Sequence, residues 1–305
     1  MSDENPRDPA TRIFGVVARA APVVVLIRRG PSKHVLLLTW NTLKHEFRAG
    51  QWLKGRIYEE RCDLSPSGDK LIYLAANHRG ELGTWTAISR PPFLTALALW
   101  DNLGTWGGGG LFHGERVVSL NKSGSLVPQP GFRMPRGLQI RPVALWAGRG
   151  EDDPIRSVRM KRDGWTLEDA GVTGIYKRHK GARKLHWEYE RPEVWHKARN
   201  GWILERRQIG IGERDGPWRV NEHRLLDPAR KVAIDLSRSD WADWSSSDEL
   251  LLAMDGRVNK MHFSVKDGPG ALEELIDLRP LRFEQVPPPT EATTWHQKVE
   301  GRRLK

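Results

Sequence analysis

The sequence predicts an all-β protein built from a series of small sheets, and three observations point to this class. Short apolar runs rich in β-branched and aromatic residues alternate with polar turns along most of the 305 residues. Gly and Pro, the residues that separate short strands, number 30 and 20. No stretch longer than ten residues has convincing helical periodicity, which disfavours helical bundles and doubly wound α/β folds.

Residues 61–75 contain the clearest example of a polar turn followed by an apolar strand. The sequence Ser-Pro-Ser-Gly at residues 65–68 predicts a tight turn, because its Pro presets φ and its Gly accepts a positive φ. Asp63 and Ser65 are expected to hydrogen-bond the backbone of this turn. The apolar run at residues 71–74 then predicts a buried strand.

A weaker copy of this turn and strand occurs at residues 242–252. Its Asp243 lies 180 residues after Asp63, which is close to four repeats of roughly 40–50 residues each. The copy keeps the Asp-x-Ser sequence and the apolar strand but lacks the Pro, and Asp248 occupies the position of Gly68. The spacing favours a repeat architecture whose units have diverged.

Apolar runs bounded by turn residues predict the other strands. The clearest is residues 184–190, where Leu185, Trp187 and Tyr189 fall on one face and charged or polar residues fall on the other. This alternation indicates a half-buried strand. The remaining predicted strands are residues 13–18, 23–27, 34–40, 47–52, 83–88, 94–100, 116–120, 138–146, 218–226, 232–236, 258–265 and 272–283.

The Asp-x-Ser-Pro-x-Gly turn followed by an apolar strand resembles a blade motif of TolB-type, WD40-like β-propellers. Longer strings, at residues 56–66, 85–100, 106–112 and 240–244, resemble an uncharacterised family of bacterial proteins with WD40-like blades. The resemblance extends over residues 22–283. It implies the propeller fold and a bacterial, cytoplasmic setting, and it implies no activity and no catalytic residue.

Dividing the length of the chain by the usual blade spacing predicts a β-propeller of about six blades. Residues 13–286 are expected to form this single domain, with flexible tails at residues 1–12 and 287–305. Another β-barrel or a pair of sandwiches is the alternative. If there are two domains instead, the boundary is expected in residues 121–137, which are rich in Gly, Pro, Ser and Asn.

The charge of the chain is unevenly distributed. The net charge is +11, and residues 133–207 contain 18 Lys and Arg residues against 10 Asp and Glu residues. A basic face of this kind attracts nucleic acid, anionic lipid or acidic proteins, and it is equally compatible with a solvated surface.

The single cysteine, Cys62, rules out an intrachain disulfide and favours a reducing compartment. Residues 1–12 lack the pattern of a signal peptide, and the apolar run at residues 20–26 is too short to span a bilayer. We therefore expect a cytoplasmic protein without a membrane-spanning segment.

One basic and aromatic cluster is a candidate binding surface. Two Trp residues lie near it in the chain, Trp187 and Trp202, and bases of a nucleic-acid strand stack on such rings. The alternative is that the Trp residues belong to the core and that the basic residues only solvate loop tips. The basic residues of this candidate are Lys177, Arg178, Lys180, Arg183 and Lys184.

Three other patterns are compatible with chemistry, and each has a simpler structural interpretation. The four glycines at residues 107–110 resemble a phosphate cradle, but no Gly-Lys-Ser/Thr sequence or helix follows, which favours a closely packed turn. His186, Glu188 and Glu190 share one face of a strand, where they are either metal ligands or an ion-paired surface. Asp243 lies in an acidic loop and is either a calcium ligand or the residue that caps its turn.

Cys62 precedes the first turn and is expected to be a small buried residue rather than a nucleophile. The sequence has no Gly-x-Ser-x-Gly, His-Glu-x-x-His or Cys-x-x-Cys motif, so we assign no catalytic residue, metal ligand or cofactor. The resulting expectation is a non-enzymatic scaffold that binds a protein partner. The alternatives are an enzyme or small-ligand binder that uses the central channel, and a protein that binds nucleic acid or another polyanion through residues 133–207.

Overall fold

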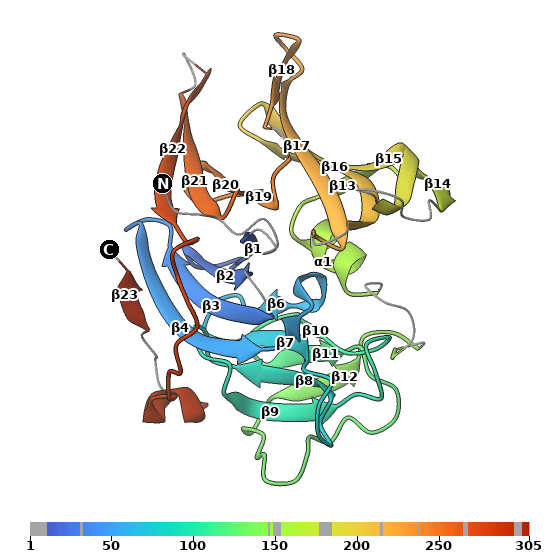
Figure 1. Cartoon of the computed structure of the whole chain (residues 1–305), viewed down its shortest axis with the longest axis vertical. Coiled ribbons are helices and arrows are strands. Elements are labelled where there is room, and N and C mark those ends of the chain that lie inside the picture. Colours follow the sequence, from blue (N-terminus) through green and yellow to red (C-terminus); the bar gives the residue numbers. More distant parts are fainter. Residues whose placement is uncertain are drawn as a thin grey trace. The chain divides into compact units, whose positions relative to one another are not determined.

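A computed structural model of the chain confirms the all-β class (Figure 1). It describes residues 11–30, 33–145, 147–148, 154–176, 185–213, 216–236, 238–264, 268–295 and 301–304. These residues form 23 strands, together with one α-helix, α1 (Arg156–Arg162), and two 3-10 helices, η1 (Glu59–Arg61) and η2 (Thr290–Thr293).

The chain folds into two compact units that are both discontinuous in sequence. The first contains the described residues of Met1–Phe14, Gly30–Ser32 and Met160–Leu281. The second contains those of Gly15–Arg29, Lys33–Arg159 and Arg282–Lys305. The long apolar runs of the sequence lie mostly in the second unit, and the long amphipathic strands lie in the first.

Three sheets organise the second unit. One has the order β1-β2-β3-β4-β23, although residues 12–14 of β1 are assigned to the first unit. The next has the order β5-β7-β8-β9 with β6 also paired to β7, and the third has the order β10-β11-β12. In the third sheet β12 lies parallel to β11, whereas β10 lies antiparallel to it. The bounds are β1 (Arg12–Val17), β2 (Val23–Arg29), β3 (His34–Asn41), β4 (Glu46–Lys54), β5 (Arg56–Ile57), β6 (Asp63–Leu64), β7 (Leu71–Ala76), β8 (Thr84–Ser89), β9 (Ala96–Asp101), β10 (Gly110–Phe112), β11 (Val117–Leu120), β12 (Gln139–Pro142) and β23 (Arg302–Leu304).

Two sheets organise the first unit. The larger has the order β13-β15-β16-β17-β18, with β14 also paired to β15, and the smaller has the order β19-β20-β21-β22. The bounds are β13 (Thr166–Asp169), β14 (Val172–Tyr176), β15 (Leu185–Arg199), β16 (Trp202–Glu213), β17 (Arg219–Asp227), β18 (Val232–Asp235), β19 (Trp241–Trp244), β20 (Leu250–Met254), β21 (Arg257–Ser264) and β22 (Gly268–Asp277).

Each unit has a core of its own. In the second unit, side chains of β7, β8, β9, β10 and β11 pack together, with Trp100 and Phe112 at 0% exposure among them. In the first unit, Trp165, Trp195, Trp202 and Trp244 belong to one buried cluster that both sheets share. Tryptophan is frequent in this sequence, and four of these residues fill much of the core of the first unit. Large aromatic side chains suit this role because each buries a large apolar area.

A short sequence echo has a structural counterpart. The dipeptide Gly-Trp occurs at residues 164–165 and again 37 residues later at residues 201–202. Gly164 and Gly201 both have a positive φ, +91° and +82°, and each turns the chain so that the following Trp enters the same core.

Several boundaries differ from the prediction. The strand expected at residues 138–146 ends at Pro142. The helix α1 was not predicted because its seven residues are too few to display a helical period. The segment expected to be a C-terminal tail contributes η2 and β23, and β23 pairs with β4.

No closed barrel or ring of blades is detected in the part of the chain that the structure describes, so the number of blades stays a prediction. Within the same described residues, no helix combines the length and apolar character that a bilayer crossing requires.

Candidate functional site

The turn that follows β6 is held by Ser65, as the sequence predicts. The Ser65 backbone N–H donates to the Lys70 carbonyl at 2.9 Å, and the Lys70 N–H donates to Ser65 Oγ at 3.1 Å. Gly68 adopts a φ of +78° and donates its N–H to the Ser65 carbonyl at 2.9 Å. Asp63 reaches beyond the turn, since its Oδ2 accepts the backbone N–H of Phe112 at 2.7 Å and thereby fixes β10 next to β6.

The second turn, between β19 and β20, repeats this geometry with one residue fewer. The Ser245 N–H donates to the Glu249 carbonyl at 2.9 Å, and the Glu249 N–H donates to Ser245 Oγ at 3.0 Å. Asp248 has a φ of +65°, so it occupies the conformation as well as the sequence position of Gly68. The predicted relation between the two turns is therefore confirmed at the level of individual hydrogen bonds.

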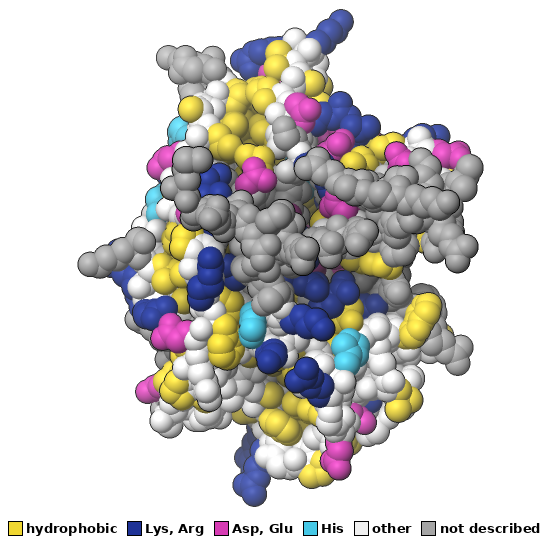
Figure 2. Space-filling view, viewed as in Figure 1, with side chains coloured by type: hydrophobic (Ala, Val, Ile, Leu, Met, Phe, Trp, Pro, Cys, Tyr) yellow, Lys and Arg dark blue, Asp and Glu magenta, His cyan; other side chains and the backbone are white. Residues whose placement is uncertain are grey.

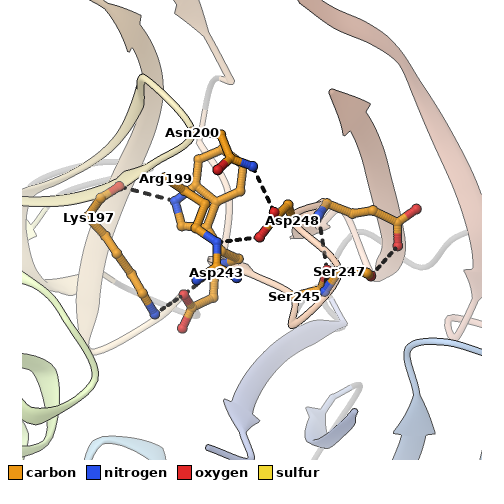
Figure 3. Close-up of polar contacts among 9 residues, drawn as sticks. Lys197, Arg199, Asn200, Asp243, Ser245, Ser247 and Asp248 are labelled. Atoms are coloured by element: carbon orange, nitrogen blue, oxygen red, sulfur yellow. Dashed lines mark hydrogen bonds and ion pairs between the residues drawn. The ribbon is translucent and has the colours of Figure 1, made fainter. Parts of the chain in front are cut away.

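The second turn is fastened to the hairpin of β15 and β16 by four polar contacts (Figure 3). Lys197 Nζ donates to Asp243 Oδ1 at 2.6 Å, and Trp244 Nε1 donates to the Lys197 carbonyl at 3.1 Å. Asp248 accepts from Arg199 Nε and, at 2.8 Å, from Asn200 Nδ2. Asp243 also accepts the Trp244 N–H at 2.8 Å, while two N–H groups of the turn itself go to Ser245 Oγ. These carboxylates join two sheets of the first unit.

The four-glycine loop is filled by protein atoms. A Cβ on Gly109 would collide with the Arg61 carbonyl, and one on Gly108 would lie 2.5 Å from a methyl group of Leu74. The Gly109 N–H is donated to Thr86 Oγ1 at 2.8 Å, and the Gly108 N–H to the Asn121 carbonyl at 2.6 Å. A phosphate cradle needs free N–H groups, so the loop is the closely packed turn that the sequence favoured.

Arg61 anchors this glycine loop from inside the second unit. Its side chain is 2% exposed, and Nη1 donates to the carbonyls of Thr105 and Gly107, the latter at 2.9 Å. The carbonyls are thereby held in place on both sides of Trp106, which is 68% exposed. A buried cation thus fixes the backbone beneath an exposed indole.

Trp106 lies on the loop after β9, and exposed leucines lie on this loop and on the loop after β12. The loop after β9 is joined to the loop after β11 through Lys122 Nζ, which donates to the Asp101 carbonyl at 2.7 Å. Asn121 Oδ1 in turn accepts the Gly148 N–H at 2.7 Å and joins the loop after β12. We define the loop surface as the exposed side chains of Leu103 (108% exposed), Trp106 (68%) and Leu145 (103%) on these loops.

Sequence analysis did not identify the loop surface. The type of residue alone does not distinguish an exposed Leu or Trp from a buried one in a protein with many core tryptophans. The available signal was the position of Leu103 and Trp106 in residues 102–109, a stretch rich in Gly that has no strand alternation.

The predicted basic cluster of Lys177, Arg178, Lys180, Arg183 and Lys184 lies outside the described residues. Of its two tryptophans, Trp202 is in the core at 7% exposure and Trp187 is 40% exposed. Figure 2 shows Lys and Arg side chains gathered over the face of the second unit that is turned to the viewer.

Part of the basic excess in residues 133–207 is buried. Arg156, Arg159 and Arg206 are 3%, 6% and 8% exposed. Arg159 donates to the carbonyl of Cys62 and forms an ion pair with Glu60 at 3.1 Å. The net charge of a sequence segment therefore overstates the charge of its surface.

A buried histidine and serine lie side by side in the first unit. His223 Nδ1 and Ser239 Oγ are 2.7 Å apart, at exposures of 2% and 4%. Burial, with the charge of Arg206 as a smaller cause, lowers the pKa of His223 to about 3. A general base needs a pKa near the working pH and access to a substrate, so this pair is structural.

The metal site that the sequence left open as an alternative at His186, Glu188 and Glu190 has no counterpart among the described residues. No group of three His, Cys, Asp or Glu side chains is close enough to hold a metal ion in the described part of the chain. Glu188 and Glu190 are exposed on β15, and the side chain of His186 lies outside the described residues. The nearby His196 is paired with Glu205 at 3.0 Å on the outer face of the sheet.

Cys62 is 0% exposed, which confirms that it is a buried residue. Its Sγ donates to the Tyr58 carbonyl at 3.3 Å, and burial raises the pKa of the thiol. A reactive cysteine needs a lowered pKa and exposure, and Cys62 has neither.

Comparison with protein-family models, curated proteins and solved structures finds no match to this chain.

Proposed function

We propose that the protein is a non-enzymatic interaction protein that binds a protein partner through the loop surface. The observation that carries this proposal is the exposure of Leu103, Trp106 and Leu145 on two loops, after β9 and after β12, which hydrogen bonds of Asn121 and Lys122 join together. Trp is the residue type most enriched among those that dominate binding energy at protein interfaces.

Buried side chains hold the backbone of the loops that carry the loop surface, and this favours a binding role for the exposed residues. Arg61 and Asn121 are 2% and 0% exposed, and both bond to the backbone of these loops. A loop that is ordered before binding loses less conformational entropy when a partner docks, so its contacts yield more net affinity.

The alternative functions have less support in the described residues. The His223–Ser239 pair is enclosed, the glycine loop is filled, and the aspartates of both turns bond to the protein itself. Binding of nucleic acid would depend on the basic cluster at residues 177–184. Several arginines of the surrounding residues 133–207 are buried, so they add no charge to a binding surface.

We further infer that the sheets are diverged blade-like units of a propeller-type repeat and that the protein works in a reducing cytoplasm. The two matching Asp-x-Ser turns support the repeat, and the single buried thiol supports the compartment. An experimental structure that resolves how the sheets close, or fail to close, into a ring tests the architecture.

The proposed function is tested by affinity capture with chemical crosslinking from the native lysate. We expect Trp106→Ala to reduce recovery of the specifically bound protein by about thirtyfold, since truncation of a central aromatic anchor costs about 2 kcal/mol or more. Leu43→Ser is the matched control, because Leu43 is also exposed (62%) but lies in the turn between β3 and β4.

Equal recovery with Trp106→Ala and with the wild-type protein would contradict the proposal. So would crosslinks that map to other surfaces and leave the loops of Leu103, Trp106 and Leu145 untouched.

A further inference from the structure

A pocket of about 200 Å³ lies within the second unit, next to the first Asp-x-Ser turn. Its walls come from β3, from the start of β4, from the turn after β6 and from the Arg90-Pro91 segment after β8. We call it the Arg90 pocket and define it by Trp40, Lys44, Glu46, Arg48, Asp69 and Arg90, so that three cations and two carboxylates line it.

Arg90 is a buried cation with unused donors. The residue is 5% exposed, and among the described residues it forms one hydrogen bond, from Nη1 to the Trp295 carbonyl at 2.8 Å, and no ion pair. A guanidinium has five N–H donors. Burial lowers the pKa of Arg90, and the charge of Asp69 partly offsets this effect.

Two further cations line the Arg90 pocket. Lys44 is exposed at its entrance, and only its backbone N–H, which donates to Asn41 Oδ1 at 3.0 Å, has a hydrogen bond among the described residues. Arg48 lies 3.6 Å from Glu46, and Glu46 is also paired with Arg303 at 3.2 Å. The carboxylate of Glu46 is thus shared between two arginines.

The wall of the pocket contains a second unused donor. The indole N–H of Trp40 is buried and has no hydrogen-bond partner within the described part of the chain, while the ring stacks on Phe47 at 5.2 Å. An unpaired donor in a protein interior is unfavourable by about 1–3 kcal/mol. Trp40 also lines the pocket, so its indole resonance can report on an anion bound beside Arg90.

We propose that the Arg90 pocket binds a small molecule through a carboxylate or phosphate group, with Arg90 as its main partner and Lys44 and Arg48 as supporting charges. Oxyanions of both types match the fork of a guanidinium and accept two N–H groups at once. Asp69 at the rim disfavours a ligand that carries a second anionic group on that side and favours one with a hydroxyl or amine there. This site is separate from the loop surface and does not depend on the proposed protein partner.

The proposal is tested by NMR titration of the ¹⁵N-labelled full chain at pH 7 and constant ionic strength. Inorganic phosphate and acetate are the two probes, and sodium chloride is the control for charge screening. We expect a saturable shift of the Trp40 indole resonance with at least one probe. A larger affinity for phosphate assigns a phosphorylated ligand, and a larger affinity for acetate assigns a carboxylate.

Substitutions locate the bound anion. Arg90→Gln is expected to weaken binding by about tenfold or more, because a charge-assisted hydrogen bond is lost. Lys44→Gln, at the exposed entrance, is expected to weaken it by about two- to fivefold. Lys54→Gln is the matched control, since Lys54 is an exposed lysine at the far end of β4 and should leave binding unchanged.

Absence of any saturable shift with both probes would overturn the proposal. Equal weakening by Lys44→Gln and Lys54→Gln would also overturn it, because binding would then reflect the general charge of the protein. If Arg90→Gln does not fold, Arg90→Lys keeps the charge and removes the fork, and wild-type affinity in that variant would contradict the paired contact from the guanidinium on which the proposal rests.

Discussion

Several arginines of this protein are buried inside the fold rather than exposed on its surface. Arg28, Arg61, Arg90, Arg159 and Arg206 are all less than 9% exposed. The guanidinium groups of Arg61 and Arg159 donate to main-chain carbonyls that no strand partner satisfies. A buried carbonyl without a donor is costly, so these side chains replace the hydrogen bonds that regular sheets would supply.

His223 gives a prediction at the same scale. Its pKa is about 6.5 in the unfolded chain and about 3 in the folded protein, because burial opposes protonation. Above pH 6.5 neither state is protonated, and as the pH falls below 6.5 only the unfolded state takes up the proton. Stability is therefore lost on acidification, by about 2 kcal/mol between pH 7 and pH 5.

Urea unfolding at pH 7 and pH 5 measures this effect. The free energy of unfolding should change less between pH 7 and pH 5 in His223→Gln than in the wild-type protein, by about 2 kcal/mol. Glutamine does not titrate, and it still offers Ser239 a polar partner. The exposed His262 provides the control variant, His262→Gln. An identical pH dependence in all three proteins would show that His223 is protonated in the folded state.

Strands in this chain are connected by turns whose polar side chains also join neighbouring elements. The turns after β6 and β19 have the same Ser-centred hydrogen bonds, yet their aspartates bind different partners, the Phe112 N–H in one and Lys197 in the other. The local hydrogen bonds determine the shape of the turn, and the aspartate determines what packs against it.

Removing the serine hydroxyl tests the shared part of this design. Ser65→Ala leaves the Lys70 N–H unpaired, and Ser245→Ala leaves the Glu249 N–H unpaired. We expect each substitution to lower the free energy of unfolding by about 1–3 kcal/mol. Ser246→Ala, at an exposed position of the second turn, is the control and should change stability by less than about 0.5 kcal/mol.

Chemical denaturation followed by Trp fluorescence provides the measurement. Wild-type stability in both Ser65→Ala and Ser245→Ala would mean that water replaces the hydroxyl at no cost, and the serine would then not stabilise either turn.

At the scale of the whole molecule, the chain returns to complete a unit that it began much earlier. After 122 residues assigned to the first unit, Met160–Leu281, the segment Arg282–Lys305 rejoins the second. Strand β23 then pairs with β4, and Arg303 forms an ion pair with Glu46 at 3.2 Å. An edge strand that would otherwise be open is covered in this way.

Deletion of residues 301–305 tests this closure. We expect a loss of about 1–3 kcal/mol in the stability of the second unit, because several main-chain hydrogen bonds of β4 lose their partners. Hydrogen exchange should show faster exchange at the edge of β4, and size-exclusion chromatography should show more self-association. Deletion of Lys305 alone is the control. Unchanged exchange at β4 would contradict a role for β23 in protecting that edge.

The features that sequence alone could predict are those that depend on neighbours in the chain. Gly68 and Asp248 occupy equivalent turn positions because the requirement for positive φ is local. The role of Arg61 depends on carbonyls 44 and 46 residues away, and no residue pattern encodes that distance. The Arg90 pocket was missed for the same reason, since its cations come from separate elements.

The function was less predictable than the fold. Binding of a polyanion through residues 133–207 was predicted from charge density, which does not reveal that Arg156, Arg159 and Arg206 are buried. The loop surface, by contrast, consists of ordinary apolar residues, and only their exposure distinguishes them from the core.

The burial of Cys62 has a practical consequence. Because it is the single thiol of the chain and is fully enclosed, maleimide reagents should leave the native protein unmodified. A pair of cysteines introduced at surface positions, one in each compact unit, would then accept fluorophores or spin labels without background. Distances between such labels would report how the two halves of the molecule are arranged in solution.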